Sequence, residues 1–211
     1  MNVARTRKDQ HMNRSTLKRT ALTVCMLSVF HVMSFRVPAQ TTYGSQTVNT
    51  VIEGTSNIHD WELISSRGSC TMLLNLDATG KLTGIGNVQY VIQVNTLKSK
   101  HGSQLDNNAY KAMNAEDHPV IRFSGTNGSV KPAANGMYAV TVPGKLSISS
   151  GTRDVVLTAM VKVNADRSVT IDGVQQLKTT DYNIKAISIM LGAIKTSPDV
   201  TVKYNMNVRP Q

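Results

Sequence analysis

Apolar and polar residues alternate one by one along four stretches of the chain. These stretches cover residues 88–94, 140–148, 155–163 and 200–208. Successive side chains on a β-strand point to opposite faces, so each stretch predicts a strand that buries one face and exposes the other. The pattern indicates antiparallel strands with one side packed on a core.

Shorter stretches of similar character predict further strands, at residues 46–56, 60–65, 68–76, 121–126 and 168–174. Turn residues separate the strands, at 77–80, 127–128, 135–136 and 164–167. Gly, Asn and Asp favour the short connections that join antiparallel neighbours. Strands at intervals of about 10–15 residues suit a barrel or a sandwich.

One segment has helical periodicity instead. Apolar residues recur at helical spacing from Leu105 to Met113, and Ser103 is a candidate N-cap. Pro119 begins the next strand, because the residue before a proline is disfavoured in a helix. We therefore predict one short helix, over about residues 103–115, in an otherwise all-β domain.

The exposed edges of the sheet favour its closure into a barrel, and the composition indicates what fills that barrel. Hydrophobic residues make up 40% of the chain and aromatic residues 5%, so the core is built mainly from Val, Ile and Leu. Closing an antiparallel sheet into a barrel removes its exposed edges. Medium-sized inward side chains leave room along the axis, so the pattern permits an apolar tunnel. Residues 40–211 show no repeat or linker, which predicts a single domain.

Residues 1–39 have the order of a cleaved export signal peptide. Basic residues precede an apolar stretch at 21–35, and Val37-Pro38-Ala39 supplies a small residue at the cleavage position. The apolar stretch is short for a transmembrane helix. We expect cleavage after this tripeptide and a periplasmic or secreted protein. The alternative to a cleaved signal is an uncleaved membrane anchor. For the start of the chain, Met12 is the alternative to Met1.

The net charge of +10 is concentrated in the same segment. Seven of the 23 basic residues and one of the 13 acidic residues fall within residues 1–39, so the remainder carries a net charge near +4. No basic stripe with interleaved aromatic residues is present, which argues against nucleic-acid binding. No later stretch approaches about 18 consecutive apolar residues, so we expect no stable membrane span after cleavage.

Cysteine usage excludes a disulfide framework in the expected mature chain. Cys70 is its single cysteine, and it lies in a predicted strand. No His or basic cluster stands near it in sequence to lower its pKa. We therefore expect a buried, unreactive thiol.

Several segments resemble the YceI-like family of exported lipid-binding proteins. In order, these are Ile52–Trp61, Val94–Ser99 with His118–Phe123, Gly144–Val155, and Leu177–Ile184 with Met190–Lys195. Together they span about residues 46–208. The resemblance implies an extended, eight-stranded, antiparallel, lipocalin-like barrel. It also implies a long apolar ligand of polyisoprenoid type threaded through that barrel.

The candidate site residues follow from the strand pattern and this resemblance. We expect ten residues to line an apolar lumen: Trp61, Tyr90, Ile92, Val94, Phe123, Val140, Leu146, Leu157, Val161 and Tyr204. His59 and Arg153 are candidates for contact with a polar head group. The alternative for each is structural: core packing for the lumen residues, and a solvated charge for His59 and Arg153.

Neither metal binding nor catalysis is predicted. His59, His101 and His118 are the histidines after the signal, and none forms a close ligand pair in sequence. The Gly-x-Ser-x-Gly nucleophile motif is absent, and the acidic residues are isolated. We expect no enzyme and no cofactor, other than a bound isoprenoid lipid.

The leading hypothesis is non-catalytic binding of an apolar lipid, of polyisoprenoid or isoprenoid-quinone type, for carriage or sequestration in the cell envelope. The alternative is an exported structural or partner-binding domain with a filled barrel. A hydrolase or isomerase acting on a lipid is a third hypothesis, which would require a polar pair with shifted pKa values inside the cavity. The sequence leaves both a monomer and a homodimer open.

Overall fold

The computed structural model describes residues 40–185, 188–189 and 194–211. The predicted signal peptide, residues 1–39, lies outside the described residues, as do residues 190–193 of the last family-like segment. The described residues all belong to one compact unit. In the described part of the chain, no helix is long and apolar enough to cross a membrane.

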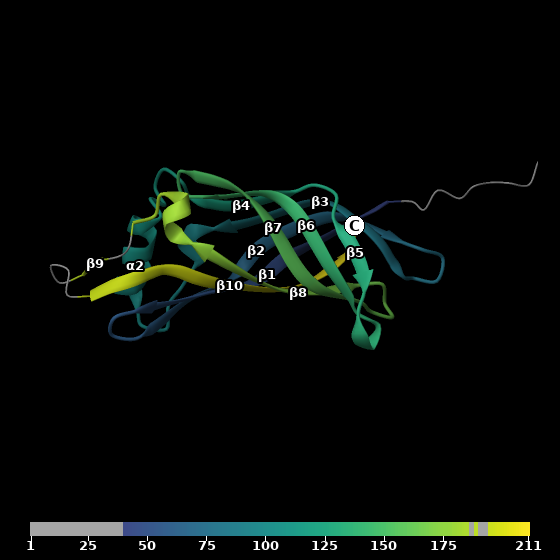
Figure 1. The fold of residues 1–211 in the computed structure, drawn as a ribbon, viewed down its shortest axis with the longest axis horizontal. Coiled ribbons are helices and arrows are strands. Elements are labelled where there is room, and N and C mark those ends of the chain that lie inside the picture. The colour runs from purple at the N-terminus through teal and green to yellow at the C-terminus, as the bar shows by residue number, and fades with distance from the viewer. Residues whose placement is uncertain (1–39, 186–187, 190–193) are drawn as a thin grey trace, which may run out of the picture. The chain divides into compact units, whose positions relative to one another are not determined.

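Strands dominate the described fold (Figure 1). The strands are β1 (Thr41–Ser56), β2 (Asp60–Leu76), β3 (Leu82–Gln93), β4 (Val120–Gly125), β5 (Ser129–Pro132), β6 (Tyr138–Ile148), β7 (Gly151–Val163), β8 (Val169–Lys178), β9 (Ser188–Ile189) and β10 (Ile194–Pro210). The helices are α2 (Ser103–Ala112) and the 3-10 turns η2 (Val94–Thr96), η3 (Ala134–Gly136) and η4 (Thr179–Tyr182).

Eight strands close into an antiparallel barrel. Their order is β1-β2-β3-β4-β6-β7-β8-β10, and β10 returns to pair with β1. The short strands β5 and β9 pair with β6 and β10 respectively. The predicted all-β, eight-stranded barrel with one short helix is therefore confirmed. Figure 1 shows α2 and η4 at one end of the barrel and the β2–β3 hairpin at the other.

Three local predictions were wrong. The strands expected at 60–65 and 68–76 form the single strand β2, because pairing with β1 continues past a register shift near Gly68. Gly102, not Ser103, is the N-cap of α2. The helix ends at Ala112, and Asn114 just beyond it adopts a positive φ of 49°, which is typical of a helix end.

Three of the four predicted turns, at 77–80, 135–136 and 164–167, are confirmed by their backbone conformation. The fourth, at 127–128, joins β4 to β5, which pair with β6 and not with each other. Asn135 and Gly136 have φ values of 57° and 69°, as a tight hairpin turn requires. Gly80 and Arg167 also adopt positive φ in the β2–β3 and β7–β8 connections. These short turns hold consecutive strands in antiparallel register.

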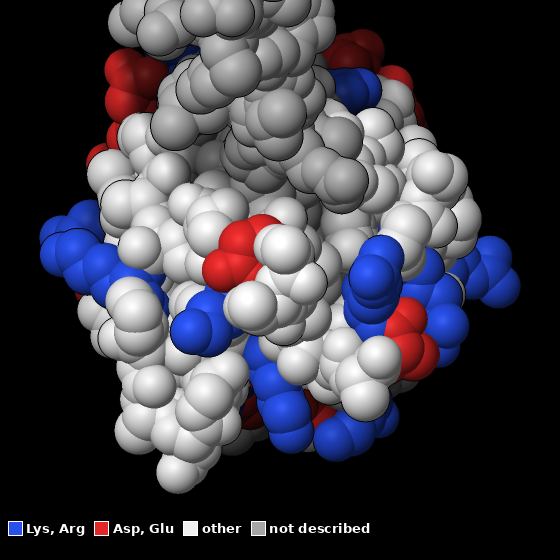
Figure 2. Space-filling view, turned by 90° about the vertical axis from the view of Figure 1, so that its right-hand side faces the viewer, with Lys and Arg blue, Asp and Glu red and all other residues white. Residues whose placement is uncertain are grey.

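The barrel end at the β2–β3 hairpin is filled by the protein's own side chains. Five residues there are at most 3% exposed: Tyr43, Leu74, Leu82, Val169 and Val208. None of them lines the cavities described below. On the part of this end that is visible in Figure 2, Lys and Arg side chains are spread over the surface and do not form one patch.

The pairing between β7 and β8 covers only part of each strand. It runs over five residue pairs, from Val163–Val169 to Ala159–Gly173. Beyond that point, residues 151–158 of β7 pair with β6, and residues 174–178 of β8 pair with β10. The two strands diverge toward the end that carries η4 (Figure 1). We call this gap in the hydrogen-bond ladder the β7–β8 opening.

Tyr204 of β10 marks the point where the two strands part. A Cβ atom on Gly173 would lie 2.1 Å from the Tyr204 Cζ atom, so the tyrosine ring occupies the space above this glycine. The Tyr204 hydroxyl donates a hydrogen bond to the Thr158 carbonyl oxygen at 3.0 Å. The pairing of β7 with β8 stops at Ala159, and Thr158 is the residue just before it in the chain. The hydroxyl therefore satisfies a backbone acceptor at the start of the opening.

Replacing Gly173 by Ala should lower the free energy of unfolding by about 1–3 kcal/mol, because the added methyl group overlaps the Tyr204 ring. Urea denaturation would measure this loss. In a Tyr204→Leu background the same substitution should cost less, since the two residues share the space. Equal costs in both backgrounds would contradict this packing argument.

Candidate ligand cavity

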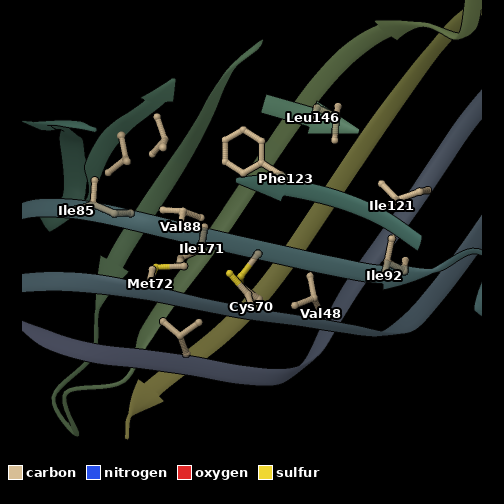
Figure 3. Close-up of a cluster of buried hydrophobic side chains, with 14 of the residues drawn as sticks. Val48, Cys70, Met72, Ile85, Val88, Ile92, Ile121, Phe123, Leu146 and Ile171 are labelled. Atoms are coloured by element: carbon tan, nitrogen blue, oxygen red, sulfur yellow. The ribbon is translucent and has the colours of Figure 1, made fainter. Parts of the chain in front are cut away.

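A cavity of about 110 Å³ lies inside the barrel, and every one of the eight barrel strands contributes to its wall. The alternation along each strand places these side chains on the inner face. Figure 3 shows Cys70 and Met72 of β2 directed inward, near Val88 of β3 and Ile171 of β8. We call this space the main cavity.

The few polar groups in the wall of the main cavity have partners or are neutral. The hydroxyl groups of Tyr90 and Thr50 are hydrogen-bonded at 2.6 Å. Burial raises the pKa of the Cys70 thiol, the Tyr90 phenol and the Tyr204 phenol to about 12 each. At neutral pH these three groups are protonated and uncharged, so they do not attract water as ions would.

A second cavity of about 90 Å³ lies between the barrel and α2. The helix contributes Leu105, Ala109 and Ala112, followed by Met113. Five residues belong to the walls of both cavities: Ile52, Ile121, Ile148, Leu177 and Val202. The two apolar spaces are therefore neighbours separated by single side chains.

A larger, polar groove of about 1150 Å³ opens on the side of the barrel. It lies along the β7–β8 opening, between residues 153–156 of β7 and 175–178 of β8, and η4 and the ends of β1, β2 and β10 complete it. Leu177 lines this side groove and both apolar cavities. The apolar interior therefore meets the polar groove at Leu177.

Trp61 stands at the boundary between polar and apolar surroundings. It lines both the side groove and the second cavity. Its ring lies over Gly54, the residue opposite it on β1, where a Cβ atom would come within 2.2 Å of the ring. Its indole Nε1 donates a hydrogen bond to the Thr55 carbonyl oxygen at 3.2 Å. One face of the ring is therefore fixed by the β1–β2 hairpin.

Carboxylates outnumber cations in the wall of the side groove. The six carboxylates are Glu53, Asp60, Glu62, Asp154, Asp181 and Asp199, and the basic residues are His101, Arg153 and Lys178. Lysines pair with four of the carboxylates, in Lys203–Glu53, Lys100–Glu62, Lys145–Asp154 and Lys178–Asp199. Among the described residues, Asp60 and Asp181 make no ion pair. The groove therefore has a surplus of negative charge.

The sequence profile of the YceI-like domain matches residues 66–208. This match covers more than half of the chain. It includes five of the eight barrel strands completely and most of β2 and β10. The chain belongs to the YceI-like family.

Two solved structures with the same fold are similar to this YceI-like chain. BcnA from Burkholderia cenocepacia is 18% identical, with a TM-score of 0.59, and the match covers 77% of this chain and 96% of that one. A polyisoprenoid-binding domain from Saccharophagus degradans is 12% identical, with a TM-score of 0.61, covering 82% and 100%. A search of curated protein sequences gives no match.

Eight of the ten residues predicted to line the lumen of this YceI-like barrel are in the wall of the main cavity: Tyr90, Ile92, Phe123, Val140, Leu146, Leu157, Val161 and Tyr204. Trp61 lines the second cavity instead. Val94 is fully buried but lies in η2, outside the wall of either apolar cavity. Its backbone N–H bonds to the Pro119 carbonyl oxygen at 2.9 Å, in the register of the β3–β4 ladder, but Pro119 has no N–H to return the bond, and the chain turns into η2.

The two predicted head-group residues lie in different surroundings. Arg153 lines the side groove, and its guanidinium donates a hydrogen bond to the Thr152 carbonyl oxygen. The His59 ring stacks on His101 with centroids 5.2 Å apart, and its Nδ1 lies 2.8 Å from the Asp60 carbonyl oxygen. Of the stacked pair, His101 lines the groove and His59 does not. Contact of either predicted residue with a ligand stays a prediction.

Sequence reasoning missed several wall residues, above all Leu177. The inward alternation of β8 includes Ile171 and continues through Gln175 and Leu177, past the predicted strand end at residue 174. The double glutamine at 175–176 conceals this alternation, because a polar residue occupies one inward position. The stacked pair His59–His101 was also invisible, since its members are distant in sequence. In the described part of the chain, no three potential metal-ligating residues converge.

The buried groups predict a loss of stability at alkaline pH. In the unfolded chain the thiol titrates near 9.0 and the two phenols near 10.0, whereas in the fold all three titrate at about 12. Between pH 9 and 12 the unfolded chain therefore binds fewer protons, and the free energy of unfolding should fall as pH rises. Urea denaturation across this range would show it. The Cys70→Ala variant should give a shallower fall, and an unchanged slope would count against a buried thiol.

Proposed function

We propose that the barrel binds an apolar lipid of polyisoprenoid or isoprenoid-quinone type in its interior. The observation that carries this proposal is a pair of adjoining apolar cavities that meet a polar groove at Leu177. A lipid with an apolar chain and a polar end matches this division into an apolar interior and a polar groove. The polyisoprenoid-binding domain from Saccharophagus degradans, which shares the fold, supports the choice of ligand class.

The energetics favour such a ligand. Each methylene group moved from water into the interior contributes roughly 0.8 kcal/mol. An apolar cavity of about 150 Å³ suffices to bind benzene, and the two cavities have about 110 and 90 Å³. A longer chain requires wall side chains to move. Met72 and Met206 in the wall are unbranched and flexible, and suit this adjustment.

We further propose that binding is non-catalytic. The titratable side chains in the wall of the main cavity are Cys70, Tyr90 and Tyr204, and burial keeps each of them protonated at neutral pH. A general base or an activated nucleophile needs a pKa near the working pH or below it. These groups have the opposite shift, which supports binding over turnover.

The place of action that we propose is the cell envelope or the exterior. The basic, apolar and small-residue order of residues 1–39 supports export through a cleaved signal peptide. An exported protein with an apolar interior would carry or sequester a lipid across water. The alternative, a partner-binding domain with a filled barrel, differs in that it requires no ligand in the interior.

The test is lipid extraction and mass spectrometry of the purified protein, with a blocked variant. In Ala159→Phe the added ring projects into the main cavity, and the bound lipid should fall at least about tenfold, since several methylene contacts are lost. Ala139→Phe is the matched control, because Ala139 is exposed on the neighbouring strand. Circular dichroism would confirm that both variants fold.

Two results would overturn the proposed function. One is a wild-type protein that carries no lipid and takes up none of an added isoprenoid alcohol such as farnesol. The other is equal lipid content in the Ala159→Phe and Ala139→Phe variants, which would mean that the lipid binds outside the barrel.

A further inference from the structure

The described barrel differs at its two ends. The end at the β2–β3 hairpin is filled by residues that are almost completely buried, including Leu74 and Val208. Toward the other end, the hydrogen-bond ladder between β7 and β8 stops at Ala159–Gly173. A lipid chain that enters the main cavity from the filled end must displace core side chains. A lipid chain that enters through the β7–β8 opening breaks no hydrogen bond of the ladder.

The walls of the cavities also converge on this opening. Leu177 belongs to the side groove and to both apolar cavities, and Gln175 belongs to the groove and the main cavity. Both residues lie on the part of β8 that has left β7. On the outer surface beside the opening, Val156 of β7 and Val174 of β8 are 51% and 53% exposed. Apolar side chains thus continue from the outside to the interior at this place.

We infer that the ligand enters the barrel sideways, between β7 and β8, and that its polar end stays in the side groove and is uncharged. This inference rests on the proposed function, and adds the route, the orientation and the class of head group. The apolar chain passes Leu177 into the main cavity. Tyr204 limits the opening on the side of the intact ladder, where its hydroxyl bonds to Thr158.

The charge of the groove decides the class of head group. Six carboxylates face the groove, and lysines balance four of them. Among the described residues, Asp60 and Asp181 make no ion pair, and Arg153 is the one Lys or Arg of the groove wall that makes none, so unpaired carboxylates exceed unpaired cations of this kind. A hydroxyl or carbonyl head group avoids this repulsion and still accepts or donates hydrogen bonds.

Trp61 provides a native reporter of orientation. It is the single tryptophan of the chain, and it lines the side groove and the second cavity but not the main cavity, where the far end of the chain is expected to lie. Bromine quenches indole fluorescence on contact. We therefore choose two twelve-carbon alcohols as probes: 2-bromododecan-1-ol, with bromine beside the head group, and 12-bromododecan-1-ol, with bromine at the far end of the chain.

The expected result is stronger quenching of Trp61 by the 2-bromo alcohol at saturation, because its bromine stays in the groove. Stronger quenching by the 12-bromo alcohol, with both probes bound, would overturn the sideways orientation while leaving lipid binding intact. Failure of both probes and of unbrominated dodecanol to bind would instead refute the proposed function.

The head-group class is tested by comparing dodecanol with dodecyl phosphate. Dodecanol should bind more tightly than dodecyl phosphate. Asp181→Asn should narrow this difference by strengthening dodecyl phosphate binding about two- to fivefold, as expected for one exposed charge interaction. Glu116→Gln is the matched control, because it removes one negative charge at an exposed position outside the groove. Tighter binding of dodecyl phosphate, or equal effects of both substitutions, would overturn the assignment of an uncharged head group to this groove.

Discussion

The pairing of the first strand with the last is the constraint on which the barrel depends. β1 and β10 are joined antiparallel from Tyr43–Pro210 to Ser56–Thr196. A slip of one residue in a strand pair exchanges its inner and outer faces. The register between β1 and β10 therefore determines that Thr50, Ile52 and Val202 face inward. Closure converts eight separate alternations into one apolar interior.

Closure by itself does not make a continuous wall. The ladder between β7 and β8 is short, and the backbone groups beyond it lie beside a solvent-filled groove where water can bond to them. The Tyr204 hydroxyl bonds to one carbonyl at the point of divergence. Gly173 makes this arrangement possible, because any side chain there would occupy the space of the tyrosine ring. A small residue and a large one on adjacent strands thus define where the barrel wall ends.

The sequence predicted the strands and their inner faces well, because alternation is a local signal with a period of two residues. Eight of ten expected lumen residues lie in the main cavity for this reason. The side groove was not predicted, since it arises where two strands fail to pair, and pairing depends on residues far apart in sequence. Val94 shows the other limit. The alternation continues through it, but β3 ends one residue earlier, where Pro119 on the opposite strand has no N–H to continue the ladder and the turn η2 begins.

The position of β10 in the chain has a consequence for the order of folding. The seven other barrel strands precede it, and its contacts with β1 join residues as distant as Tyr43 and Pro210. Contacts of such long sequence separation form slowly, because a large loop must close first. During synthesis the barrel therefore stays an unclosed sheet until β10 is available. Until β10 pairs, β1 and β8 are the two edge strands of an open sheet, and their unpaired backbone groups can pair with another chain.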